Sequence, residues 1–283
     1  MFKTIIAQTR FLLRQKAALI TFYILLAMVL ANFAGNVIVF QGTDVIAMYH
    51  PMKLLLLSYN RINWNADNTM LLVQLYPLLV AIPAGLSLAR ERQIGQDVLM
   101  ASRIGNLPYR VSKLASAFLT TTIVFSCPFL IEIALNSLSF PLNAQGDLSN
   151  VNVFDTEYIS MVRNYLFREL YLCSPYLYAV LGTLYFGFLS GLIVASTVAL
   201  SSVVKVKFRA FLILPAFLFL YASVYLASLL HENGIEMEVA WYHYFLPFND
   251  EIKSPVLFAA VILILLIWSV VSTVLGGIQD CVQ

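Results

Sequence analysis

The sequence predicts an all-α polytopic membrane protein with six transmembrane helices, an N-terminal interfacial helix and a cytoplasmic helix between spans 2 and 3. Hydrophobic residues make up 60% of the 283 residues and charged residues only 11%, whereas soluble domains carry about 25% charge. Six apolar runs also reach the length of about 20 residues that a spanning helix needs. Basic residues are distributed unevenly between these runs. We therefore expect a single transmembrane domain over residues 1–283.

The first sixteen residues, MFKTIIAQTRFLLRQK, predict an interfacial helix that lies flat on the inner leaflet. Its apolar residues fall on one helical face: Phe2, Ile5, Ile6, Leu12 and Leu13. Lys3, Arg10 and Arg14 fall on the other face and would meet the lipid headgroups. The alternative is a plain basic flank that follows the positive-inside rule.

The six predicted spans cover about residues 17–40, 70–89, 114–140, 175–200, 210–230 and 255–277. An even number of spans places both termini on the same side of the membrane. Of the 17 Lys and Arg residues, twelve lie in the N-terminal segment and in the second and fourth loops. Because basic residues concentrate on the cytoplasmic side, we expect both termini in the cytoplasm and the protein in the cell membrane.

The sequence lacks the motifs of several kinds of chemistry. It contains no GxxxxGK[ST] loop for ATP phosphates. Cys127, Cys173 and Cys281 have neither a metal-ligand spacing nor a disulfide pattern. We therefore expect no catalytic residue, no metal site, no cofactor held by this chain, and hence no enzyme activity of its own. The net charge of +2 is too small to predict nucleic acid as a partner.

One carboxylate falls inside a predicted span. Glu132 lies in the run CPFLIEIALN, and charge at membrane depth is costly and usually faces protein or water. Glu132 is therefore the candidate residue of a substrate path. The alternative places Glu132 near the outer end of the span, where it reaches the interface or caps a helix broken at Pro128.

The segment between the second and third spans, ARERQIGQDVLMASRIGNLPYRVSK, holds seven charged residues. Ile94, Val98, Leu99 and Ile104 recur at helical spacing among polar residues. This pattern predicts a short amphipathic helix over about residues 93–102. Gly105, followed by a proline, is a typical C-terminal stop. The alternative is an ordinary cytoplasmic loop.

This segment resembles the permeases of the ABC-2 type transporter family. The matched residues are Glu91-Arg92-x-x-Gly95, Leu99-Met100-x-Ser102, and Arg110 and Lys113 before the third span. The six-span layout and the N-terminal helix are also similar to that family. The sequence departs at Gln96, where Thr or Ser is common, and at Ile104-Gly105, where Pro is common, so the subfamily stays open.

The resemblance implies that residues 93–102 form a coupling helix that binds in a cleft of a separate ATPase subunit. Ile94, Val98 and Leu99 would make its apolar contacts, and Gly95 and Ser102 complete the matched motif. Glu91 and Arg92 would form ion pairs at the helix start, where a negative charge suits the helix dipole. Two ATPase subunits, which carry ATP and Mg, would serve two permease chains, identical or related.

Two loops on the predicted external side carry features of their own. The third loop contains YISMVRNYLFRELYLC (158–173), which predicts a short amphipathic helix. The fifth loop is rich in aromatic residues between Trp241 and Phe248. The family resemblance suggests short re-entrant helices there, and the alternative is an aromatic belt around the last span.

Together these features predict the permease subunit of an ABC exporter. Its apolar spans favour an amphipathic or hydrophobic cargo, such as a peptide, an antibiotic or a lipid-like molecule. A secondary transporter or channel is one alternative, but it would need ionisable residues in several spans. A non-transporting membrane subunit is another. The sequence leaves open the cargo and the choice between homodimer and heterodimer.

Overall fold

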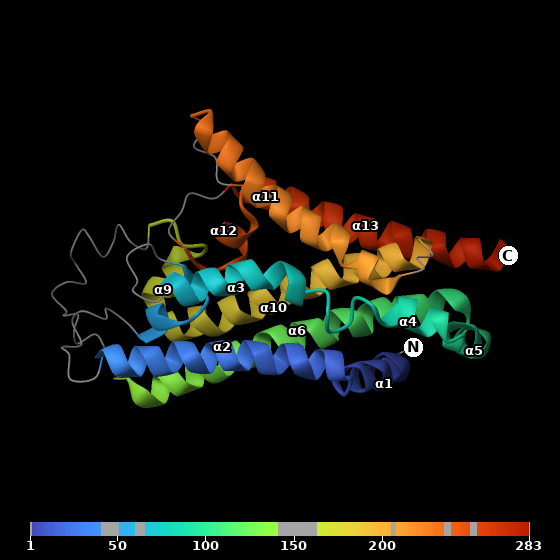
Figure 1. Cartoon of the computed structure of the whole chain (residues 1–283), viewed down its shortest axis with the longest axis horizontal. Helices are drawn as coiled ribbons and strands as arrows, with labels where there is room; N and C mark the ends of the chain where they lie inside the picture. The colour runs from blue at the N-terminus through green and yellow to red at the C-terminus, as the bar shows by residue number, and fades with distance from the viewer. Residues whose placement is uncertain are drawn as a thin grey trace.

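The computed structural model of the protein describes residues 2–40, 51–59, 66–140, 163–204, 208–234, 239–249 and 254–282. Almost all of the described chain is helical (Figure 1). The predicted all-α class is therefore confirmed.

Among the residues that the structure describes, five helices are long and apolar enough to cross a membrane, which is the character of a multi-pass membrane protein. They are α2 (Lys16–Phe40), α6 (Asn106–Ser139), α10 (Pro175–Val203), α11 (Leu214–Glu232) and α13 (Pro255–Val282). Four of them match predicted spans closely, and α6 begins eight residues before the predicted residue 114. Prolines at the starts of α10 and α11 fit the first helical turn, where the missing N–H is not needed. The short helix η4 (Arg209–Leu212) precedes α11.

The expected second span over residues 70–89 is not one continuous helix. Helix α3 (Ala66–Leu79) ends early, residues 80–86 form turns, and α4 (Ser87–Gln93) follows. Pro83 cannot donate a backbone hydrogen bond. A Cβ at Gly85 would lie only 2.5 Å from the carbonyl oxygen of Ala81, so the tight turn needs glycine. The apolar sequence pattern predicts a spanning segment over this stretch, but it does not predict that the helix is interrupted.

The two chain ends and α5 (Gln96–Ile104) lie at one end of the long axis, and α9 (Arg168–Cys173) lies toward the other (Figure 1). Helix α1 (Phe2–Leu13) is close to the predicted interfacial helix and ends at a break before α2. The predicted apolar residues of α1 do not share one environment, because Leu12 is buried whereas Phe2 and Ile6 are exposed. The inward side of α1, including Thr9, packs against the protein rather than facing lipid.

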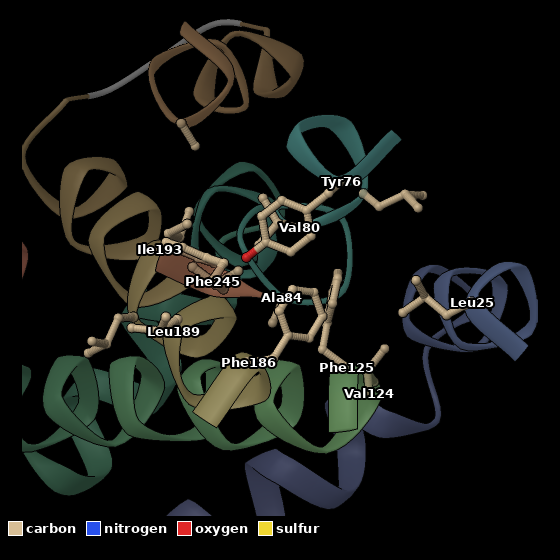
Figure 2. Close-up of a cluster of buried hydrophobic side chains, with 14 of the residues drawn as sticks. Leu25, Tyr76, Val80, Ala84, Val124, Phe125, Phe186, Leu189, Ile193 and Phe245 are labelled. Carbon is tan, nitrogen blue, oxygen red and sulfur yellow. The ribbon is translucent and has the colours of Figure 1, made fainter. Parts of the chain in front are cut away.

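The main core joins α3, α6, α10 and α12 (Trp241–Phe245) around one tyrosine (Figure 2). The Tyr76 ring stacks on Trp241 with centroids 4.6 Å apart and meets the edges of Phe125 and Phe245. Its hydroxyl lies 2.9 Å from the Ser190 hydroxyl, so the polar tip of the ring has a partner within the core. This packing holds α3 against α10 up to the turns that precede α4.

The opposite end from α5 contains a short inserted segment. It comprises η2 (Pro51–Leu54) and β1 (Ser58–Tyr59), and β1 pairs in parallel with β3 (Phe248–Asn249). All residues from 51 to 58 are buried. Most aromatic residues of the fifth loop are also buried, with Trp241 at 5% and Phe248 at 1% exposure, so they pack inside the protein and do not form an aromatic belt. Of the helix predicted over 158–173, α9 is present, and residues 158–162 lie outside the described residues.

Candidate functional site

The segment that follows α3 folds into two short helices rather than the single helix predicted over residues 93–102. Helix α4 ends at Gln93 and α5 begins at Gln96. Gly95 between them has a φ of 72°, and Gly105 after α5 has a φ of 88°, both in the region that favours glycine. The predicted stop at Gly105 is therefore confirmed. Because α4 ends before Gly95, Glu91 and Arg92 lie in its last turn and not at the start of the helix that follows.

Helix α5 exposes Val98 and Leu99, whereas Met100 and Ala101 pack partly against the core. The exposed fractions are 67% for Val98 and 64% for Leu99, and 59% for Ile94 just after α4; no residue of α5 is buried. Ser102 is also exposed, and its hydroxyl donates to the carbonyl of Leu99 within the helix. The acid in the first turn of α5 is Asp97, which takes the place expected for Glu91 beside the helix dipole. An exposed apolar surface on a short helix is suited to binding another protein.

Glu91 fastens α4 to the beginning of α6. The Lys113 ammonium lies 2.5 Å from one carboxylate oxygen of Glu91. The Tyr109 hydroxyl donates to the other oxygen, also at 2.5 Å. The Lys113 side chain is only 1% exposed, so this ion pair is largely removed from water. Sequence reasoning singled out Glu91 and Lys113 but missed Tyr109, which lies one helical turn before Lys113.

Arg92 fastens α4 to the end of α10. Its two terminal nitrogens donate to the carbonyl oxygens of Ser201 and Ser202, at 2.6 and 2.9 Å. Arg110 of α6 donates to the same Ser202 oxygen at 3.1 Å. The last carbonyls of a helix lack intrahelical partners and carry its negative dipole end, so two guanidinium groups stabilise the end of α10. Asp97 is a more distant partner, 3.9 Å from Arg92.

Helix α13 completes this junction. The Ser202 hydroxyl donates to the carbonyl of Ser272 at 2.8 Å. A Cβ at Gly276 would lie 2.6 Å from the Ser202 oxygen and 2.7 Å from a nitrogen of Arg110. Gly276 therefore allows α13 to approach the arginines closely. We call Glu91, Arg92, Arg110, Lys113 and Ser202 the junction cluster, because these residues join α4 to α6, α10 and α13.

Glu132 lies far from this cluster and is completely buried on α6. One of its oxygens accepts hydrogen bonds from the Asn32 side chain at 2.7 Å and from the Leu56 backbone N–H at 2.9 Å. Asn32 and Asn36 of α2 both donate to the carbonyl of Leu54 at 2.9 Å. Glu132 thus holds the inserted segment against α2 and α6. It neither reaches the surface nor caps a break, because α6 is continuous through Pro128.

Within the described ranges, no group of three or more His, Cys, Asp or Glu side chains could hold a metal ion. The site chemistry there consists of ion pairs, carbonyl contacts and an exposed apolar helix face. Comparison with protein-family models, with curated proteins and with solved structures gave no match. The likeness of residues 89–113 to ABC-2 permeases is therefore a resemblance of motif and layout.

Proposed function

We propose that this chain is the membrane-spanning permease subunit of an ABC exporter, driven by a separate ATPase subunit. The observation that carries the proposal is the contrast between α5 and α4. Val98 and Leu99 on α5 are about two-thirds exposed, whereas α4 next to it is held by the buried pair of Glu91 and Lys113. A helix that receives force from another protein needs both an accessible apolar face and a firm connection to the spans.

The junction cluster supplies two connections through which a displaced α4–α5 unit would act. Glu91 would transmit the displacement to α6 through Lys113, and Arg92 would transmit it to α10 through the Ser201 and Ser202 carbonyls. Two permease chains would form the cargo path above two ATPase subunits. ATP and Mg on those ATPases would favour one of two arrangements of the spans, because ligand binding shifts a conformational equilibrium only through different contacts in the two states.

The same proposal includes a sixth crossing of the membrane by α3, the turns over 80–86, and α4. Broken helices are tolerated at membrane depth where protein surrounds the irregular backbone. Val80, Ala81 and Ala84 in this stretch are buried, which meets that condition. Both chain ends lie at the end of the molecule that holds α5 (Figure 1), as an even number of crossings requires. We place that end in the cytoplasm on the distribution of Lys and Arg.

The proposed cargo is amphipathic or hydrophobic: a peptide, an antibiotic or a lipid-like molecule. Glu132 stays the candidate cargo contact, but its carboxylate is buried beneath the inserted segment. Contact with cargo would therefore require residues 51–58 to separate from α2 and α6. An outward-open arrangement of the spans would provide that separation.

Co-purification with the ATPase subunit tests the proposal. Val98→Glu/Leu99→Glu should abolish co-purification, because two carboxylates in an apolar contact would lose their hydration. Phe208→Glu is the control, since Phe208 is 64% exposed just before η4, away from α5, and its substitution should leave binding unchanged. The charge exchange Glu91→Arg/Arg92→Glu should weaken co-purification through the junction cluster. An ATPase subunit that never binds the unaltered chain would refute the proposal.

A further inference from the structure

Helix α1 carries basic side chains along an open groove that it forms with α6. Two adjoining hollows of about 410 and 430 Å³ share Ile6, Arg10 and Arg14 in their walls. Leu13 of α1 and Leu119 of α6 line the first hollow. The second continues along α1, where Lys3 and Phe11 line it. Arg10 lies in the last turn of α1 and Arg14 directly follows its last residue, Leu13, and both side chains line the two hollows together.

The charged side chains around this groove are all positive. The first acidic residue in the sequence is Asp44, so α1 and its surroundings in sequence contain cations without anions. In the part of the chain that the structure describes, no carboxylate forms an ion pair with Lys3, Arg10 or Arg14. All three side chains are exposed. The groove is therefore complementary to an anion.

The floor of the groove is apolar. Ile6 is 47% exposed and Leu119 is 41% exposed beside the arginines. Leu119 lies six residues beyond Lys113, the last cation of α6, which corresponds to about 9 Å of helix rise. An inorganic anion has no apolar part that could pack against these side chains. An acidic headgroup at the arginines with an acyl chain over Leu119 would use both parts.

We propose that the groove between α1 and α6 binds an anionic phospholipid, with its phosphate between Arg10 and Arg14 and an acyl chain over Ile6 and Leu119. Bound lipid would hold α1 against α6 at the lipid surface. The proposal requires that α2 and α6 lie in a bilayer, but it does not require an ATPase. Its failure would leave the proposed coupling through α5 untouched.

Native mass spectrometry of the detergent-purified chain tests this site, with phosphatidylglycerol, phosphatidylcholine and soluble glycerol 3-phosphate as probes. Phosphatidylglycerol should bind in preference to phosphatidylcholine. Arg10→Gln/Arg14→Gln should weaken phosphatidylglycerol binding about 30-fold, from the usual contribution of two basic residues near an anionic lipid. Arg163→Gln/Arg209→Gln removes the same charge from exposed positions outside the groove and should change binding less than about twofold.

Two further variants keep the test decisive if the glutamine variant fails to fold. Arg10→Lys/Arg14→Lys keeps the charge and should retain binding, whereas Leu119→Trp fills the apolar floor and should weaken it. Equal binding of phosphatidylglycerol by the unaltered chain and by the Leu119→Trp and glutamine variants would overturn the proposal. Equal binding of the two lipids would also overturn it. Competition by glycerol 3-phosphate at the same concentration as the lipid would identify a site for free anions instead.

Discussion

Replacing Glu91 by glutamine tests the connection between α4 and α6. Lys113 Nζ lies 2.5 Å from Glu91 Oε1, and the two side chains are 1% and 15% exposed. Glu91→Gln leaves the buried ammonium without its counter-charge, and breaking a buried pair in this way costs about 3–5 kcal/mol. Because glutamine keeps one oxygen that accepts a hydrogen bond from Lys113, we expect a loss near the lower limit, about 3 kcal/mol.

A double-mutant cycle separates the free energy of the Glu91–Lys113 interaction from the contributions of other contacts. Lys113→Met removes the ammonium while the Glu91 carboxylate keeps the hydrogen bond from Tyr109. The double variant Glu91→Gln/Lys113→Met should therefore be more stable than Glu91→Gln alone. We expect a coupling free energy of about 2 kcal/mol, within the range for residues in direct contact. The measurement is the free energy of unfolding in mixed detergent–dodecyl sulfate micelles.

Arg103→Gln is the control for this cycle, because Arg103 is an exposed cation on α5. An exposed substitution of this kind changes the free energy of unfolding by less than about 0.5 kcal/mol. A similarly small effect of Glu91→Gln, together with no coupling to Lys113, would show that the pair does not fasten α4 to α6.

Two other substitutions probe the packing around the two sites. Gly276→Ala should lower the free energy of unfolding by about 1–3 kcal/mol, because its Cβ would lie 2.6 Å from the Ser202 carbonyl oxygen. Glu132→Leu should lower it by about 2 kcal/mol or more, since Asn32 and the Leu56 N–H would lose a buried acceptor. Glu132→Gln keeps an acceptor oxygen there and should be the milder change.

Each of these predictions has its own comparison in the same unfolding assay. Val274→Ala on α13 alters a side chain that is 41% exposed and should have less effect than Gly276→Ala. A Gly276→Ala variant as stable as the unaltered chain would mean that α13 does not pack closely on the junction cluster. If the leucine and glutamine variants of Glu132 are equally stable, the carboxylate does not hold the inserted segment.

The sequence predicts the long helices well because apolarity over about 20 residues is a strong signal. The start of α10 at Pro175 also follows from local chemistry, whereas α11 starts at Leu214, four residues after the predicted residue 210. The break after Leu79 does not, because Pro77 lies within α3 without ending it. Whether such a proline breaks a helix depends on tertiary packing, here the contacts of Tyr76 with the core.

The site was predictable in part for a similar reason. The exposed face of Val98 and Leu99 follows from helical periodicity, and the stop at Gly105 follows from glycine chemistry. The partners of Arg92 could not be predicted, because they are backbone carbonyls at Ser201 and Ser202, which carry no sequence signal. The burial of Glu132 beneath residues 51–58 likewise depends on a contact between segments distant in sequence.

Cross-linking at position 98 tests the central claim most directly. A Val98→Cys chain with Cys127, Cys173 and Cys281 replaced by serine would be expressed with the proposed ATPase subunit in cells, together with a Leu138→Cys counterpart. Leu138 is 85% exposed near the far end of α6. We predict that the Val98→Cys thiol cross-links to the ATPase and is shielded from a membrane-impermeant maleimide outside the cell, while the Leu138→Cys thiol does not cross-link. Labelling of the Val98→Cys chain from outside intact cells, with no cross-link to any ATPase, would contradict the account.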